Sequence, residues 1–151
     1  MSIIVLVFSI LSACSISSSE EQNDASLAEI QGVNVSGKVS NYHFSVTVKS
    51  PDTGCDQYAN WWEVLSENGE LIYRRILAHS HVDEQPFTRS GGPVKIKDSD
   101  VVIVRMHMNN SGYSSLAMKG SAKGGFEKII LEEGFASEVE LQAPQPDGCR
   151  F

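Results

Sequence analysis

The sequence has little basic charge, few cysteines and no stretch of helical periodicity. Twelve Lys and Arg residues stand against nineteen Asp and Glu residues among 151, and the net charge is −7. Because nucleic-acid binding needs a basic surface, this balance argues against a nucleic-acid partner. The chain also lacks internal repeats, a dinucleotide-binding glycine motif and a G-x-S-x-G sequence. These absences remove the best-marked classes of enzyme from consideration.

Long apolar runs are scarce as well. The run at residues 3–13 is too short to span a bilayer but has the length of the apolar part of a signal peptide. It leads into L-S-A-C at residues 11–14, which resembles the lipobox of bacterial lipoproteins. The resemblance implies cleavage before Cys14, lipidation of that cysteine and anchoring of the exported protein in the cell envelope. Ser15 after the cysteine implies the outer membrane, and an ordinary secretory signal peptide is the alternative.

Composition divides the chain into three parts. Residues 1–13 form the predicted signal peptide, and residues 14–31 are rich in serine and acidic side chains but poor in large apolar ones. Such a segment buries too little apolar surface to offset its conformational entropy, so we expect a flexible tether. Residues 32–151 form the predicted folded domain, which is long enough to have a core of its own.

Cys55 and Cys149 are the cysteines that remain if Cys14 carries lipid. Each follows a glycine in a turn-like sequence, and an exported protein with two spare cysteines usually pairs them. We therefore expect a Cys55–Cys149 disulfide, which would contribute roughly 4–5 kcal/mol on the chain-entropy model. The alternative is two free buried thiols.

From Gly32 onward, apolar residues alternate with polar ones and turn sequences recur. Strands are expected at residues 33–35, 42–48, 60–66, 70–81, 94–97, 101–108, 113–118, 126–131 and 138–141. Short strands at this spacing, together with a predicted disulfide, favour an all-β domain. We predict a single antiparallel β-sandwich of immunoglobulin-like type, with a jelly roll or an open barrel as alternatives.

The Asn68-Gly69 pair predicts a tight hairpin between two of these strands. A two-residue turn there places Glu63 opposite Arg74 and Trp61 on the same face as both. We interpret this face as the core side of the hairpin. Its predicted core residues are Trp61, Leu65, Ile72, Ile76 and Ala78.

The segment 73–93 holds two of the four histidines and several arginines. It begins as a predicted strand and continues as a predicted polar loop over residues 82–93. His79 and His81 are two residues apart on the predicted strand, so both rings would leave the same face. That spacing is compatible with a zinc or copper site. Candidate further ligands are His107, Asp83 and Glu84.

Two interpretations without a metal compete with this one. In the first, which we favour, His79, His81, Arg75 and Arg105 hydrogen-bond to Asp83, Glu84 and loop carbonyls and hold the loop in one shape. In the second, Arg75, Arg89, Arg105, Trp62 and Tyr73 form a surface that binds an acidic or carbohydrate ligand. Neither interpretation requires a cofactor.

Catalysis is not predicted. Ser80 lies between two histidines, but neighbouring strand residues point to opposite faces, so neither ring can readily act as its base. The region from Gly54 to Gly112 resembles uncharacterised bacterial exported proteins, and this resemblance implies no activity. We expect a lipid-anchored envelope protein that acts by binding an envelope protein or a glycan, or as a structural accessory.

Overall fold

The structure is a computed structural model that describes residues 27–150. The predicted signal peptide, Cys14 and most of the predicted tether lie outside these residues. The elements are β1 (Glu29–Lys38), β2 (Asn41–Lys49), β3 (Ala59–Ser66), β4 (Leu71–Ile76), β5 (Phe87–Val94), β6 (Val102–Met108), β7 (Gly112–Tyr113), β8 (Leu116–Ser121), β9 (Gly125–Ile130) and the 3₁₀ helix η1 (Ser137–Leu141). Among residues 27–150, no helix has the length and apolar character needed to cross a membrane.

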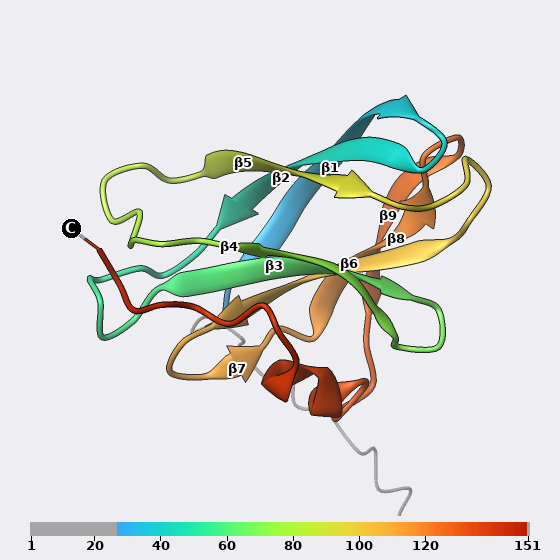
Figure 1. Cartoon of the computed structure of the whole chain (residues 1–151). Coiled ribbons are helices and arrows are strands. Elements are labelled where there is room, and N and C mark those ends of the chain that lie inside the picture. Colours follow the sequence, from blue (N-terminus) through green and yellow to red (C-terminus); the bar gives the residue numbers. More distant parts are fainter. Residues whose placement is uncertain (1–26, 151) are drawn as a thin grey trace, which may run out of the picture.

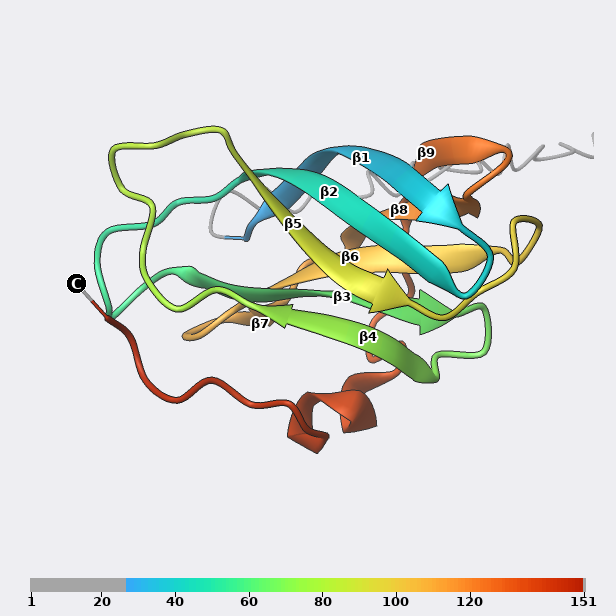
Figure 2. The same ribbon diagram turned by 45° about the horizontal axis from the view of Figure 1, so that its top comes forward.

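The strands form two antiparallel sheets that pack against each other (Figure 1, Figure 2). The smaller sheet has the strand order β1-β2-β5. The larger has the order β4-β3-β6-β8-β9, with β7 paired to β6. The predicted all-β fold with a single antiparallel β-sandwich is therefore confirmed.

Alternation along β2 and β6 explains the core between the sheets. In both strands every second side chain is apolar and buried between the sheets. These side chains are Tyr42, Phe44, Val46 and Val48 from β2 and Val102, Val104, Met106 and Met108 from β6. Burying a large apolar side chain contributes roughly 1.5–3 kcal/mol, so these two strands carry much of the stability.

The hairpin between β3 and β4 has the predicted register over most of its length. Trp61 pairs with Ile76 and Glu63 pairs with Arg74, as predicted. The register shifts next to the turn. The turn chemistry therefore positioned the pair of opposite charges correctly.

The predicted core side of this hairpin is wrong for β3, whereas Ile72 of β4 packs against the core between the sheets as predicted. Trp62 and Val64 point between the sheets, whereas Leu65 lies in a second cluster on the outer face of the larger sheet. Both faces are buried because the chain after β9 crosses the outer face. Val139 of η1 packs against Leu65 there, with Ile103 and Ala117. An alternating pattern cannot tell an inner face from an outer one when both are covered.

Around β5, the structure corrects the predicted loop 82–93 and the bounds of the strands predicted on either side of it. The polar loop predicted over residues 82–93 is largely strand, because Phe87 to Val94 pairs with β2, with Phe87 opposite Val48. The strand predicted at 94–97 is not formed there, because β5 ends at Val94. β4 also ends at Ile76, so the two histidines that follow do not lie on a strand. The connection from β4 in the larger sheet to β5 in the smaller sheet is therefore residues 77–86, which we call the 77–86 loop.

The two ends of the domain are corrected as well. β1 begins at Glu29 and both Ala28 and Ile30 are buried, so the folded domain starts before the predicted boundary at residue 32. The strand predicted at 138–141 is the 3₁₀ helix η1. Its one buried side chain is Val139. A single inward residue in a short helical turn gives the same sequence pattern as a short strand with alternating faces.

The predicted disulfide between Cys55 and Cys149 is present. Its Cα atoms are 5.6 Å apart and 94 residues separate the two cysteines. Beside it, the backbone N–H of Arg150 donates to the carbonyl of Ala78 at 2.7 Å. The disulfide therefore ties residue 149 to the β2–β3 connection, and the hydrogen bond of Arg150 ties the next residue to the 77–86 loop.

Candidate functional site

The residues singled out in the sequence fall into three places. Trp62, Tyr73 and Arg75 lie between the sheets or at their edges. Arg105 and His107 lie under residues 132–150, which we call the C-terminal segment. His79, His81, Asp83, Glu84 and Arg89 lie in or beside the 77–86 loop, at one end of the sandwich (Figure 1).

Trp62 is not available for recognition, and Tyr73 is half-buried. Trp62 is fully buried, and its ring lies 5.6 Å from that of Tyr73. Tyr73 packs beneath β5 so closely that a Cβ on Gly91 would lie 2.6 Å from its hydroxyl oxygen. Arg75 links the sheet edges, since its Nε donates to the carbonyl of Ser90 at 3.1 Å. The prediction that Trp62 takes part in a ligand-binding surface is wrong.

Glu63, Arg74 and Arg105 form a buried ion triad on the outer face of the larger sheet. Oε1 of Glu63 accepts from Nε of Arg105 at 2.8 Å, and Oε2 accepts from Nε of Arg74 at 2.8 Å. All three side chains have at most 1% exposure. They meet because β3 lies between β4 and β6, which places Glu63 opposite both arginines. Arg105 therefore does not brace the 77–86 loop as predicted.

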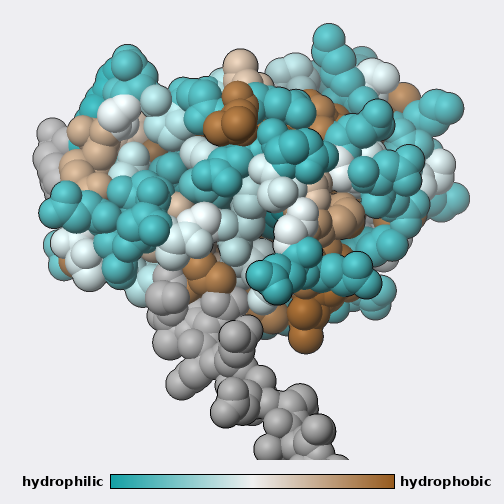
Figure 3. Space-filling view, turned by 90° about the horizontal axis from the view of Figure 1, so that it is seen from below, coloured by the Kyte–Doolittle hydropathy of each residue, from teal (hydrophilic) through white to brown (hydrophobic). Residues whose placement is uncertain are grey.

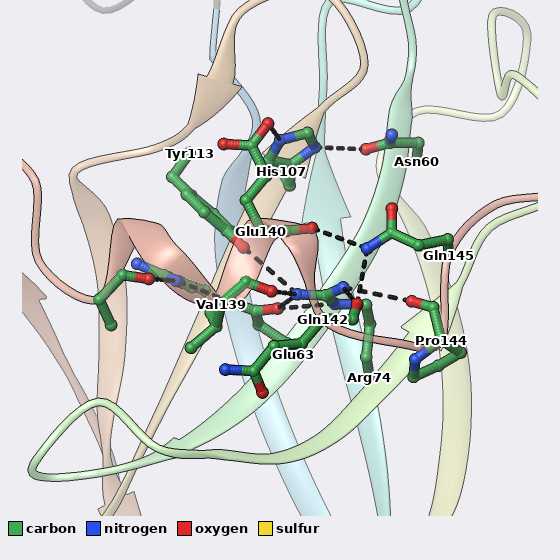
Figure 4. A network of polar contacts seen from close by, with 12 residues as sticks. Asn60, Glu63, Arg74, His107, Tyr113, Val139, Glu140, Gln142, Pro144 and Gln145 are labelled. Atoms are coloured by element: carbon green, nitrogen blue, oxygen red, sulfur yellow. Dashed lines mark hydrogen bonds and ion pairs between the residues drawn. The ribbon is translucent and has the colours of Figure 1, made fainter.

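The remaining guanidinium donors hold the backbone of the C-terminal segment (Figure 4). Arg105 donates to the carbonyls of Phe135 and Ala136, and Arg74 to those of Val139, Gln142 and Pro144. A buried ion pair is stabilising only when its other hydrogen-bonding groups are also satisfied. The triad and the segment therefore depend on each other. We call the triad and these carbonyls the outer-face network.

His107 lies on the same covered face and not beside His79 and His81, where it was predicted to be a metal ligand. Its ring stacks on Trp61 with centroids 3.7 Å apart. Nδ1 hydrogen-bonds to Oδ1 of Asn60 at 2.7 Å, and Nε2 lies 3.3 Å from Oε1 of Glu140 (Figure 4). Burial lowers the pKa of His107 to about 4, although Glu140 acts in the opposite direction. The ring is thus neutral at pH 7, and its single N–H can donate to only one of these two oxygens at a time.

The solvent side of the C-terminal segment is mostly hydrophilic. Figure 3 views the molecule from below Figure 1, where η1 lies, and hydrophilic side chains dominate this face. Apolar side chains appear there as separate patches, and Leu141 is 88% exposed. Single exposed apolar residues are ordinary on protein surfaces.

The buried carboxylate of Asp52 holds the 77–86 loop from its inner side, and sequence analysis missed this residue. Oδ2 of Asp52 accepts from the backbone N–H of His81 at 2.8 Å and lies 3.5 Å from the hydroxyl of Ser80. Oδ1 accepts from the backbone N–H of Ala59 at 2.9 Å. One buried carboxylate therefore joins the loop to the first residue of β3.

Gln85 makes a second set of bonds from within the loop. Its Oε1 accepts from the backbone N–H of Ser50 at 2.9 Å. Its Nε2 donates to the hydroxyl of Ser50 at 3.1 Å and to the carbonyl of His81 at 3.0 Å. These side-chain bonds thus fix the loop at Ser80, His81 and Gln85. Of the four side chains predicted to brace residues 82–93, Arg75 meets that segment, at the carbonyl of Ser90, whereas Asp52, Gln85 and Ser50 hold the 77–86 loop.

The outer side of the loop is open to solvent. His79, Val82, Asp83, Glu84 and Pro86 are exposed. Arg89 on β5 donates two hydrogen bonds to the Glu84 carboxylate, at 2.7 and 3.3 Å. These bonds hold the pKa of Glu84 below its usual value. The loop therefore presents a histidine, an apolar side chain and an ion pair on one fixed backbone.

The predicted zinc or copper site is not assembled. His79 and His81 lie together, with ring centroids 4.5 Å apart, but His107 is on the other side of the larger sheet. Residues 27–150 contain no group of three or more His, Cys, Asp or Glu side chains that could hold a metal ion. The metal interpretation with His107 as a ligand is therefore wrong for this structure.

Sequence signals existed for part of what was missed. The hairpin register already paired Glu63 with Arg74, and Arg105 stood on the polar face of its strand. Knowing that β3 and β6 are neighbours would have completed the triad. Asp52 gave no such signal, because its partners are backbone groups 7 and 29 residues away.

Comparison with known proteins gives one relevant similarity. No family model matches the chain, and no solved structure matches it. A protein of Halomicrobium mukohataei named "Putative lipoprotein" is 35% identical over 103 residues. Those residues are 68% of this chain and 46% of the relative, so the chain spans about half of the relative's length.

Proposed function

We propose that this protein is an exported, lipid-anchored envelope protein whose β-sandwich acts as a non-catalytic binding or accessory module. The L-S-A-C sequence at residues 11–14 and the name of the similar protein support the lipid anchor. The disulfide between Cys55 and Cys149 supports export, because such bonds persist in oxidising compartments. Ser15 after Cys14 favours the outer membrane as the destination.

The 77–86 loop is the recognition surface in this proposal. The observation that carries it is the contrast between the two sides of the loop. Asp52 and Gln85 fix its backbone from within, while His79, Val82 and Glu84 face solvent. Loops positioned by a rigid scaffold are common binding sites. A preorganised loop also loses less conformational entropy when a partner binds.

The entry point of the chain supports a partner close to the membrane. Glu29, at the start of β1, pairs with Lys49, and the neighbouring Val48 pairs with Phe87 at the end of the 77–86 loop. The chain therefore enters the sandwich at the end that carries this loop. With lipid at Cys14, we expect the loop to meet another envelope protein or an envelope glycan.

Palmitate labelling tests the anchor. The wild-type chain and Cys14→Ala are expressed in a bacterial host with radiolabelled palmitate, and both are then fractionated. We expect label only in the wild type, in the outer-membrane fraction. Equal labelling of the two proteins, or no labelling of either, contradicts the lipid anchor.

Site-specific photo-crosslinking tests the recognition surface. A photoreactive residue replaces Val82 in the loop, and a matched control replaces Val39 in the turn after β1, at the opposite end of β2. The two positions are similarly exposed, at 47% and 52%. We expect a discrete protein or glycan adduct from position 82 that weakens with Gln85→Ala. Adducts from position 39 alone, equal adducts from both positions, or none from either contradict the assignment.

A further inference from the structure

His81 is the one histidine of the 77–86 loop that is sealed inside the molecule. The residue is 3% exposed. Its ring stacks on Phe87 of β5, with centroids 3.8 Å apart and the planes at 9°. The ring of His79 lies 4.5 Å away. His81 thus fills a buried position between the loop and the smaller sheet, with one face of its ring against Phe87.

The polar atoms of this ring have no protein partner. Nδ1 and Nε2 of His81 are both buried, and no group within residues 27–150 makes a hydrogen bond with either. The carboxylate of Asp52 lies 3.8 Å from Nδ1, beyond hydrogen-bonding distance. That carboxylate already accepts the backbone N–H of His81. A neutral imidazole is tolerated in such a place, but a charged one lacks the hydrogen bonds that would offset its lost hydration.

We propose that His81 is an acid-sensitive latch, and that protonation of its ring releases the 77–86 loop from the sandwich. The released state lets the charged ring reach water and separates it from Phe87. This inference rests on the proposed recognition role of the loop for its biological meaning. It makes the recognition surface fixed at neutral pH and mobile in acid.

The charges around the ring act in both directions. Arg89 from β5 and His79 from the loop disfavour a charged ring, whereas Asp52 and Glu84 favour it. Burial is the largest influence, and the resultant pKa of His81 is lowered from 6.5. A lowered pKa means that the closed loop prefers the neutral ring. Its stability is fully present above about pH 6.5, the value in an open loop, and is lost as the pH falls below it.

The rest of the fold can tolerate this opening. The disulfide and the backbone N–H of Arg150 hold the chain at Cys55 and at Ala78, which is the second residue of the loop. The released part would therefore be the middle of the loop, with Gln85 and its bonds to Ser50. A local opening of this kind changes one surface without unfolding the sandwich.

Hydrogen exchange measured by mass spectrometry on the folded protein tests the latch. Exchange of peptides covering residues 77–86 is compared between pH 7.5 and pH 5.0 after correction for intrinsic rates. We expect the opening constant to rise by up to about tenfold per pH unit below about 6.5. His81→Phe keeps an aromatic ring against Phe87 and should abolish this rise. His43→Phe, at an exposed position on β2, is the matched control and should retain it.

Ring resonances of the wild-type protein provide a second measurement that needs no variant. We expect the His81 ring to titrate below 6.5, and loop amides to change at the same pH. A His81 pKa at or above 6.5, a loop whose exchange does not respond to pH, or a response that survives in His81→Phe overturns the proposal. Crosslinking from position 82 at neutral pH is independent of this latch, so failure of one proposal is distinguishable from failure of the other.

Discussion

The molecule has two polar regions built from similar residues, and they differ in how completely their groups are satisfied. In the outer-face network, Glu63 meets two arginines, whose other donors reach backbone carbonyls. In the 77–86 loop, one ion pair is exposed and the buried His81 ring has no hydrogen-bonding partner in the part of the chain that the structure describes. The first arrangement is closed and can only hold the fold together. The second is open on its outer side, which is what recognition requires.

The same chemistry therefore has different consequences in the two regions. Glu63–Arg105 and Glu84–Arg89 are both close pairs, at 2.8 and 2.7 Å. Breaking a buried pair leaves an uncompensated charge and costs about 3–5 kcal/mol, whereas an exposed pair contributes about 0–1 kcal/mol. Burial, and not the presence of a pair, separates scaffold from surface here.

The largest effect is expected from Glu63→Gln. The substitution leaves Arg74 and Arg105 buried without an anion, so the free energy of unfolding should fall by about 3–5 kcal/mol. Urea denaturation measures it. Glu67→Gln is the control, because its pair with Lys119 is exposed and should contribute less than about 1 kcal/mol. Equal losses in the two variants would remove the distinction.

Cys149→Ser should have the next largest effect. Loss of a bond that closes a long loop is expected to lower stability by about 2–5 kcal/mol. The C-terminal segment would still be held by Arg74 and Arg105, so its exchange should increase near residue 149 but not at Val139. Hydrogen exchange peptide by peptide checks this. Uniform loss of protection across the segment would show that the disulfide, and not the triad, holds it.

Acid should weaken the contacts of His107 with Trp61, Asn60 and Glu140 beneath the C-terminal segment. The pKa of His107 is about 4 in the folded protein and about 6.5 when unfolded, so its contribution is complete above pH 6.5 and is lost between 6.5 and 4. The loss should be at most about 3.5 kcal/mol. Urea unfolding of the wild type and His107→Gln at pH 7 and 4.5 isolates it. A pH dependence that is identical in both proteins would assign the effect to another group.

The smallest effect is expected on the open side of the loop. His79→Ala and Val82→Ser remove exposed side chains, and each should change the free energy of unfolding by less than about 0.5 kcal/mol. Thermal or urea denaturation measures it. A loss of several kcal/mol in either variant would show that the exposed loop supports the fold, and would weaken its assignment as a recognition surface.

The sequence predicted the sandwich well because alternation and turn chemistry are local. Val102 to Met108 shows the inward period directly, and Asn68-Gly69 places Glu63 opposite Arg74. The register carries the first half of the triad. Its second half, with Arg105, depends on which strands become neighbours in the sheet.

Other features depend on contacts that no local pattern encodes. The predicted core side of β3 failed because the C-terminal segment covers the outer face and buries Leu65. The prediction of a long polar loop over residues 82–93 failed because Phe87 to Val94 forms an edge strand beside β2. Asp52 binds backbone N–H groups, which leave no mark on the residues that carry them. The position of the histidines also depends on long-range contacts. His107 lies on β6 under the C-terminal segment, whereas His81 lies in the 77–86 loop.

Urea unfolding of Arg105→Ala beside Arg89→Ala tests the central distinction most directly. Each variant removes the arginine of one close Glu–Arg pair, the first buried and the second exposed. The free energy of unfolding should fall by about 3–5 kcal/mol for Arg105→Ala and by less than about 1 kcal/mol for Arg89→Ala. Losses of similar size would contradict the account, because they would mean that the loop and the outer-face network support the fold equally.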